Sequence, residues 1–102
     1  MAGYFSVEAE QLSVVRAQGA ALVSEAQIQV TVRSFNGFKG NVAMVYSGDP
    51  APDYIAPDSQ SIYVPKGGSV VNTILAGFSS GFTFTAQGTS GSSSAEDSIE
   101  VF

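Results

Sequence analysis

Hydrophobic and polar residues alternate along much of the chain. In residues 26–33 every even position is apolar and every odd position is polar. This is the period of a β-strand that has one buried and one solvated face. The same alternation occurs in residues 82–86 and 98–102. The three segments therefore predict strands whose apolar side chains point into a core.

Five further segments predict strands on shorter patterns. Residues 42–46 form a short apolar run, which is expected of a strand in the middle of a sheet. The other four segments are residues 4–8, 12–16, 62–64 and 70–75. Apolar residues nowhere recur at the i, i+3, i+4 and i+7 spacing of an amphipathic helix over three turns. The sequence therefore predicts an all-β protein.

Turn-forming residues separate the predicted strands at short and fairly even intervals. They are rich in Gly, Pro, Asn, Asp and Ser, which favour turns for different conformational reasons. They occupy residues 18–19, 36–37, 47–50, 65–68, 77–81 and 88–94. Seven to eight strands in 102 residues favour a single Greek-key β-sandwich domain over residues 1–102, with a small β-barrel as the alternative.

The side-chain inventory excludes several kinds of chemistry. The chain contains no His and no Cys, and 13% of its residues are charged while 44% are hydrophobic. It therefore has no thiolate nucleophile, no Ser-His relay, no imidazole ligand for zinc and no disulfide. We predict a folded domain that is not an enzyme and that requires no cofactor.

The charge distribution also limits the partners. The net charge is −5, and the four basic residues are scattered along the chain: Arg16, Arg33, Lys39 and Lys66. A phosphate backbone would be repelled, so we expect no nucleic acid. Glu8 and Glu10 stand where a signal peptide needs a basic start and an apolar run. No apolar stretch approaches the roughly 20 residues of a membrane span. We expect neither an export signal nor membrane insertion.

Four segments together resemble one known family. They are residues 34–42 (SFNGFKGNV), 47–50 (SGDP), 57–69 (PDSQSIYVPKGGS) and 88–91 (GTSG). In this order they are similar to the immunoglobulin-like repeats of bacterial and archaeal surface and secreted proteins, and the likeness covers about residues 5–102. Such modules also resemble the domains that decorate tailed-phage virions.

The resemblance implies an immunoglobulin-like Greek-key sandwich of seven to eight strands and two candidate functions. The first is a structural module of a phage virion, a decoration or accessory protein that binds a capsid or tail lattice in many copies. The alternative is a spacer, adhesin or carbohydrate-binding repeat of a secreted or cell-surface protein. The expected location is accordingly the virion, or else the cell surface or the extracellular space.

Three aspartates form the first candidate site. Asp49, Asp53 and Asp58 lie in one proline-rich segment, and carboxylates are ligands that Ca²⁺ prefers. Their spacing is not that of an EF-hand, and Asp also begins turns beside Pro. Calcium is therefore a possible ligand, and turn formation is the alternative.

The last strand carries further acidic residues. Glu96, Asp97 and Glu100 fit a solvated sheet edge, where charge prevents unwanted strand pairing. Glycoside hydrolysis would need two carboxylates at a fixed separation in a cleft, and the short strands and loops of this chain predict no such cleft.

Aromatic and aliphatic residues outside the alternating segments are the better candidates for partner binding. Tyr54 and Ile55 lie in the proline-rich segment, and Phe78 lies in a glycine-rich one. Phe35 and Phe38 flank the turn at residues 36–37. Exposed aromatic anchors are typical of protein interfaces. We therefore predict Tyr54, Ile55, Phe78 and Phe35 as partner contacts, and we expect Phe38 to cover the end of the core.

Overall fold

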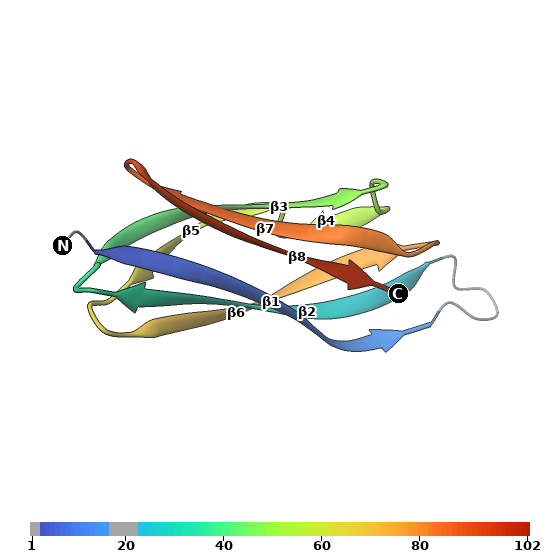
Figure 1. Ribbon diagram of the computed structural model, residues 1–102. Coiled ribbons are helices and arrows are strands. Elements are labelled where there is room, and N and C mark those ends of the chain that lie inside the picture. Colours follow the sequence, from blue (N-terminus) through green and yellow to red (C-terminus); the bar gives the residue numbers. More distant parts are fainter. Residues whose placement is uncertain (1–2, 17–22) are drawn as a thin grey trace.

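The computed structural model describes residues 3–16 and 23–102, and these form eight β-strands without a helix (Figure 1). The strands are β1 (Tyr4–Val15), β2 (Ser24–Phe35), β3 (Gly40–Asp49), β4 (Tyr54–Ala56), β5 (Ser59–Val64), β6 (Ser69–Phe78), β7 (Phe82–Ser90) and β8 (Ser93–Val101). The all-β prediction is confirmed. The described residues include no helix long and apolar enough to cross a membrane.

The strands form two antiparallel four-stranded sheets that pack face to face as a sandwich. Sheet A has the strand order β1-β2-β6-β4, and sheet B has the order β5-β3-β7-β8. The molecule measures 54 × 20 × 18 Å, and the long strands run along its long axis (Figure 1). The sandwich prediction is therefore confirmed, and the barrel alternative is not.

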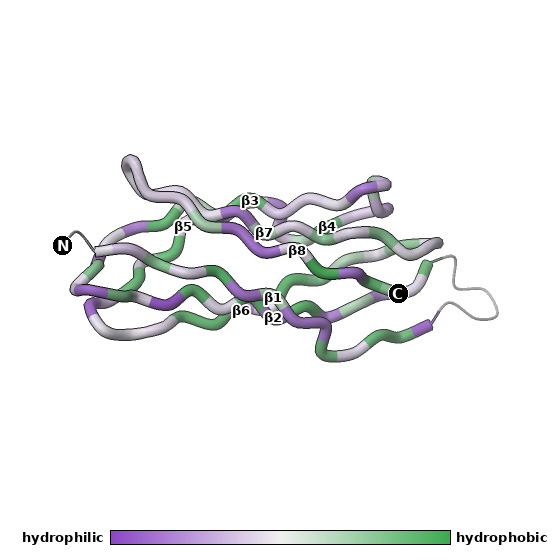
Figure 2. The backbone as a smooth tube through the Cα atoms, in the orientation of Figure 1, coloured by the Kyte–Doolittle hydropathy of each residue, from purple (hydrophilic) through white to green (hydrophobic). Residues whose placement is uncertain are grey.

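The core follows from the alternation in the sequence. The even positions of β2 from Ala26 to Val32 are completely buried, whereas the side chains between them are more exposed. Phe84 of β7 is the largest of the fully buried side chains. Figure 2 shows the resulting alternation of hydrophobic and hydrophilic residues along the strands. Burial of each large apolar side chain favours folding by roughly 1.5–3 kcal/mol.

Strand β3 is central, as the apolar run at residues 42–46 predicts, but only one of its faces is buried. It pairs with β5 on one side and β7 on the other. Val42 and Met44 point into the core, while Val45 is 52% exposed on the outer face of sheet B. β3 is therefore an ordinary alternating strand, and its sequence looks unbroken because one of its solvent-facing residues, Val45, is also apolar.

The segments 4–8 and 12–16 belong mostly to one strand instead of two. In β1 the register shifts between Gln11 and Ser13, which is the signature of a β-bulge. Phe5 and Val14 lie on the core side of the strand although their spacing is odd. The extra residue breaks the period of two, and this is why the sequence pattern indicates two short strands.

Several expected turns are partly strand. Residues 47–49 end β3, Gly77 and Phe78 end β6, and β7 continues to Ser90. Gly and Ser residues lower strand propensity but do not prevent pairing with a neighbouring strand. The turn at residues 36–37 is present, with positive φ angles of 52° at Asn36 and 80° at Gly37. The expected turn at residues 18–19 lies outside the described residues.

Candidate contact surface

Tyr54 and Ile55 lie in β4, a three-residue strand at the edge of sheet A. They pair with Gly77 and Ala76 of β6. Because side chains alternate along a strand, Ile55 packs against the core while Tyr54 points outward and is 39% exposed. Of this predicted pair, Tyr54 is thus the residue that is available to a partner.

The ring of Tyr54 lies across the backbone of β6 and reaches β2. Its hydroxyl donates a hydrogen bond to Oε2 of Glu25, which is paired with Gly77 on the neighbouring strand. A Cβ atom at Gly77 would overlap with Cε2 of Tyr54. Glycine is therefore required beneath the ring. The hydrogen bond to the Glu25 carboxylate, with smaller contributions from burial and from the negative charge, raises the pKa of Tyr54.

Phe35 forms a second exposed aromatic site at the end of β2. Its ring stacks on Tyr4 of β1, with centroids 5.1 Å apart and planes inclined by 13°. Phe35 is 39% exposed and Tyr4 is 48% exposed. The neighbouring Phe38, by contrast, packs against the core and contacts Phe5 at a centroid distance of 5.2 Å. The expectation that Phe38 covers the end of the core is confirmed.

Phe78 is a core residue and does not offer its side chain to a partner. It is 3% exposed and packs edge-on against Phe82 at a centroid distance of 5.6 Å. The glycine-rich sequence around it suggests a loop, but Phe78 is the last residue of β6 and faces the opposite sheet. The predicted contact at this position is corrected accordingly.

Phe35 and Tyr54 project from the same face of the same sheet. Tyr54 is in register with Gly77, and Gly77 with Glu25. Glu25 and Phe35 are an even number of residues apart on β2, so their side chains share a face. We call this outer surface of sheet A the aromatic face. It carries the Tyr4–Phe35 stack near one end of the long axis and Tyr54 near the other.

The outer face of sheet B differs in character. Hydroxyl side chains pair across its strands, with Thr83 donating to Glu100 at 2.7 Å and a Thr85–Ser98 bond of 2.8 Å. Val45 and Tyr63 are its most exposed large apolar residues, at 52% and 57%. None of the four predicted contact residues lies on it, because each belongs to sheet A.

The acidic residues of the segment between β3 and β5 do not converge. Asp53 accepts a hydrogen bond from the Ser79 hydroxyl at 3.1 Å, and the main-chain oxygen of Asp58 accepts from the Tyr46 amide at 2.9 Å. Among residues 3–16 and 23–102, no three His, Cys, Asp or Glu side chains are grouped closely enough to hold a metal ion. The arrangement agrees with the turn-forming alternative for Asp49, Asp53 and Asp58.

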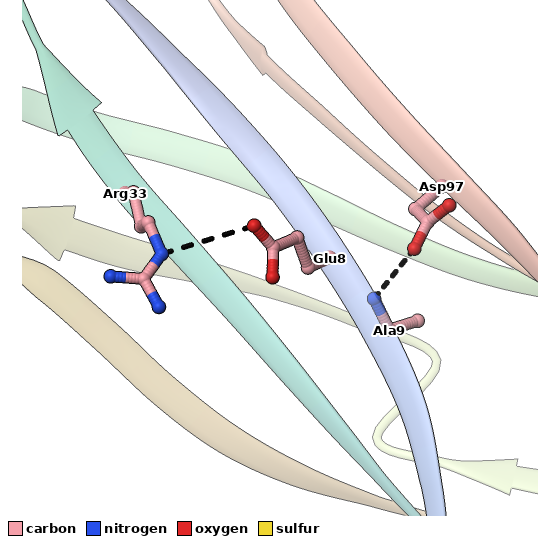
Figure 3. Close-up of polar contacts among 4 residues, drawn as sticks. All are labelled: Glu8, Ala9, Arg33 and Asp97. Atoms are coloured by element: carbon pink, nitrogen blue, oxygen red, sulfur yellow. Dashed lines mark hydrogen bonds and ion pairs between the residues drawn. The ribbon is translucent and has the colours of Figure 1, made fainter.

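The acidic residues of β8 divide between two roles. Glu96 and Glu100 are exposed, as expected of the edge strand that β8 is. Asp97 instead turns toward sheet A, where its Oδ2 accepts a hydrogen bond from the Ala9 amide of β1 at 2.8 Å (Figure 3). Sequence reasoning misses this contact because β1 and β8 are at opposite ends of the chain.

A shallow hollow of about 220 Å³ lies at the junction of β7 and β8. Gln87, Ser94, Ala95 and Glu96 line it, so its wall has a single carboxylate and no second acid or base to work with it. Comparison with protein-family models, curated proteins and solved structures gave no match to the chain.

Proposed function

We propose that the protein is a non-enzymatic structural module that docks on a larger protein lattice through its aromatic face, as a decoration or accessory protein of a phage capsid or tail. The observation that carries this proposal is that Phe35 and Tyr54 project from one face of one sheet, each 39% exposed. Aromatic side chains of this kind anchor protein interfaces because they bury a large area with few rotatable bonds.

The same proposal includes an immunoglobulin-like Greek-key topology. Five successive connections, from β2 through to β7, pass between the two sheets. As a result β2 lies beside β6, and β3 lies beside β7. Neighbours of this kind, distant in sequence, support a Greek-key arrangement.

Docking would depend on the rigid shape of the sandwich and on the presence of many copies on one particle. The rings at the two ends of the aromatic face pack against side chains of the lattice, and the sandwich holds them at a fixed separation. Each copy buries a small area and binds weakly by itself. Many copies on a symmetric particle then provide avidity, which raises the overall affinity without further contacts.

The test uses the genes beside this one and the particle they encode. Capsid and tail proteins from neighbouring genes are assembled, and binding of the wild type is compared with that of Phe35→Ala and Tyr54→Ala. We expect each substitution to weaken binding by about tenfold or more. Tyr63→Ala removes a tyrosine that is 57% exposed on the other sheet and should bind like the wild type. Neighbouring genes without particle proteins, or equal binding by all variants, would reject the proposal.

A second candidate is a spacer or adhesin repeat of a cell-surface protein. The observation in its favour is that the described chain enters at one end of the long axis and leaves toward the other (Figure 1), which suits modules joined in series. Extending the reading frame in both directions distinguishes the two candidates, because tandem copies or a signal peptide would favour the spacer. For a carbohydrate-binding version, a glycan array should show retention; an array without retention would remove it.

A further inference from the structure

The edges of the two sheets are protected to different degrees. Unpaired strand edges invite association with other strands, and folded proteins usually block them with charge, proline, bulges or covering segments. Strand β1 has a bulge, and its Ala9 amide is bonded to Asp97 of β8. Gln11 of β1 also exchanges hydrogen bonds with the main chain of Phe102, at 3.2 and 3.4 Å. The edges of β1 and β8 therefore cover one another.

On the other side of the sandwich, β5 is flanked by prolines. Pro65 directly follows the strand and Pro57 closely precedes it, and proline cannot donate to a further strand. Strand β6 is protected only in part, because β4 pairs with no more than residues 75–77. Residues 69–73 of β6 have β2 on one side and no strand among the described residues on the other.

The free hydrogen-bonding groups of β6 can be assigned from its register. The Ser34 amide donates to the carbonyl of Gly68 at 2.9 Å, so the even-numbered residues of β6 bond to β2. In an antiparallel ladder the odd-numbered residues then direct their amide and carbonyl groups to the opposite side. Ser69, Val71 and Thr73 therefore present a row of main-chain donors and acceptors at the open edge.

This edge has none of the usual protective features. Residues 69–73 contain no charge and no proline, and their register with β2 is continuous. Val71, in the middle, is 51% exposed. The edge thus combines free main-chain groups with an exposed apolar side chain.

We propose that this open edge pairs with the same edge of a second copy, in antiparallel register about Val71. The segment is complementary to itself. Val71 would face Val71 of the second copy, Ser69 would face Thr73, and Val70 would face Asn72. No charged residue lies opposite a like charge, and every free amide of the segment meets a carbonyl. Strand β4 pairs only with residues 75–77 of β6 and so does not use the main-chain groups of residues 69–73.

The dimer formed in this way has two-fold symmetry about an axis perpendicular to the sheets. Sheet A then continues from one copy to the next, and both aromatic faces point in the same direction. Self-association of this kind is isologous and closed, so it stops at two copies. It does not depend on the proposed function, since pairing is measured in solution without any particle.

Sedimentation velocity tests the pairing directly. We expect the wild type to be a dimer that dissociates on dilution. Val71→Lys would place two like charges opposite each other at the axis and should weaken dimerisation by at least about tenfold. Val45→Lys is the matched control, because Val45 is 52% exposed on a strand paired on both sides and should leave the dimer unchanged. Circular dichroism checks that both variants fold.

Cysteine substitution tests the register. The chain has no Cys, so Val71→Cys introduces a single thiol. Facing residues of a hydrogen-bonded antiparallel pair have Cα atoms about 5.5 Å apart, which a disulfide can span. Mild oxidation should yield a covalent dimer of Val71→Cys and little of Val45→Cys. The inference is overturned if the wild type is monomeric up to millimolar concentration, if Val71→Lys dimerises like the wild type, or if both cysteine variants cross-link equally.

Discussion

The two long sides of the sandwich close in different ways. On the side of β1 and β8, main-chain groups of each edge are bonded to the other sheet. The Ala9 amide of β1 is bonded to Asp97 of β8 (Figure 3), and the main chain of Phe102 is bonded to Gln11 of β1. On the side of β5 and β6, closure rests on side chains that face the interior. The Tyr46 hydroxyl of β3 donates to Oε1 of Gln60 of β5 at 2.8 Å, and part of the β6 edge stays open. The same two sheets thus have one sealed side and one side able to accept another strand.

Whether a sheet can pair with a strand of another molecule therefore depends on its edge strand and not on the sheet as a whole. The long strands of both sheets follow similar alternation, and the interior is continuous from one side to the other. What differs is whether main-chain donors find acceptors within the chain.

Loss of a buried side chain should lower stability most. Phe5 of β1 is 4% exposed, and Phe5→Ala should lower the free energy of unfolding by about 3–5 kcal/mol. On the open side, Tyr63→Ala removes a side chain that is mostly in solvent and should change stability by less than about 0.5 kcal/mol. Urea unfolding followed by circular dichroism measures both. Equal losses would contradict the placement of Phe5 in the core and of Tyr63 on the surface.

The hydrogen bond from Ala9 to Asp97 should contribute measurably to the sealed side. Asp97→Ala leaves the Ala9 amide without its acceptor and should lower stability by about 1–3 kcal/mol. Glu96→Ala removes the neighbouring carboxylate, which is exposed on the outer face, and serves as the control. Hydrogen exchange at Ala9 should accelerate in the first variant only. Unchanged exchange there would show that the amide is protected by other means.

The buried tyrosine near the open side should make stability sensitive to alkaline pH. Burial raises the pKa of Tyr46 to about 12, whereas a tyrosine in the unfolded chain titrates at about 10. The contribution of Tyr46 to the free energy of unfolding is fully present below pH 10 and is lost as the pH rises toward 12. The reason is that the Tyr46 hydroxyl releases its proton at a lower pH in the unfolded chain than in the folded protein. At about pH 11 the loss is about 1.4 kcal/mol.

Tyr46→Phe isolates this contribution. The variant loses the hydrogen bond to Gln60 and should be less stable than the wild type by about 1 kcal/mol at neutral pH. Between about pH 9 and about pH 11 its stability should decline less than that of the wild type. Chemical denaturation across this range gives both values. Parallel declines would mean that Tyr46 does not titrate as its burial requires.

Removal of calcium should have the smallest effect. Asp49, Asp53 and Asp58 lie near the open side but do not form a group of ligands. We expect the same melting temperature in EGTA and in added Ca²⁺. A difference of several degrees would restore the calcium hypothesis for this segment.

The sequence is most informative where a strand is long and one face is wet. The alternation at residues 26–33 predicts β2 and its buried positions correctly. A shift of one residue would turn all apolar side chains of the strand away from the core, so only one orientation is favourable. β4 cannot be found this way, since three residues beside prolines show no period. Its existence depends on pairing with β6, which is a contact between distant parts of the chain.

The candidate surface is predictable only in part for the same reason. Tyr54 and Phe35 can be chosen from their settings, and both prove exposed. The prediction of an exposed contact at Phe78 is wrong because the sequence pattern indicates a turn at Gly77. Gly77 instead lies within β6, where the absence of a side chain makes room for the Tyr54 ring. Tyr4 and Glu25 enter the surface through cross-strand contacts, and no local signal indicates them.

The placement of the two aromatic sites along sheet A has a further consequence. Glu25, which holds Tyr54, and Phe35 are ten residues apart on one strand, a distance of roughly 33 Å. A rigid strand keeps that interval constant. The protein would therefore bind through both aromatic sites at once only to a surface whose own binding sites repeat at the same interval. On a surface with another periodicity it would bind through one site and dissociate sooner.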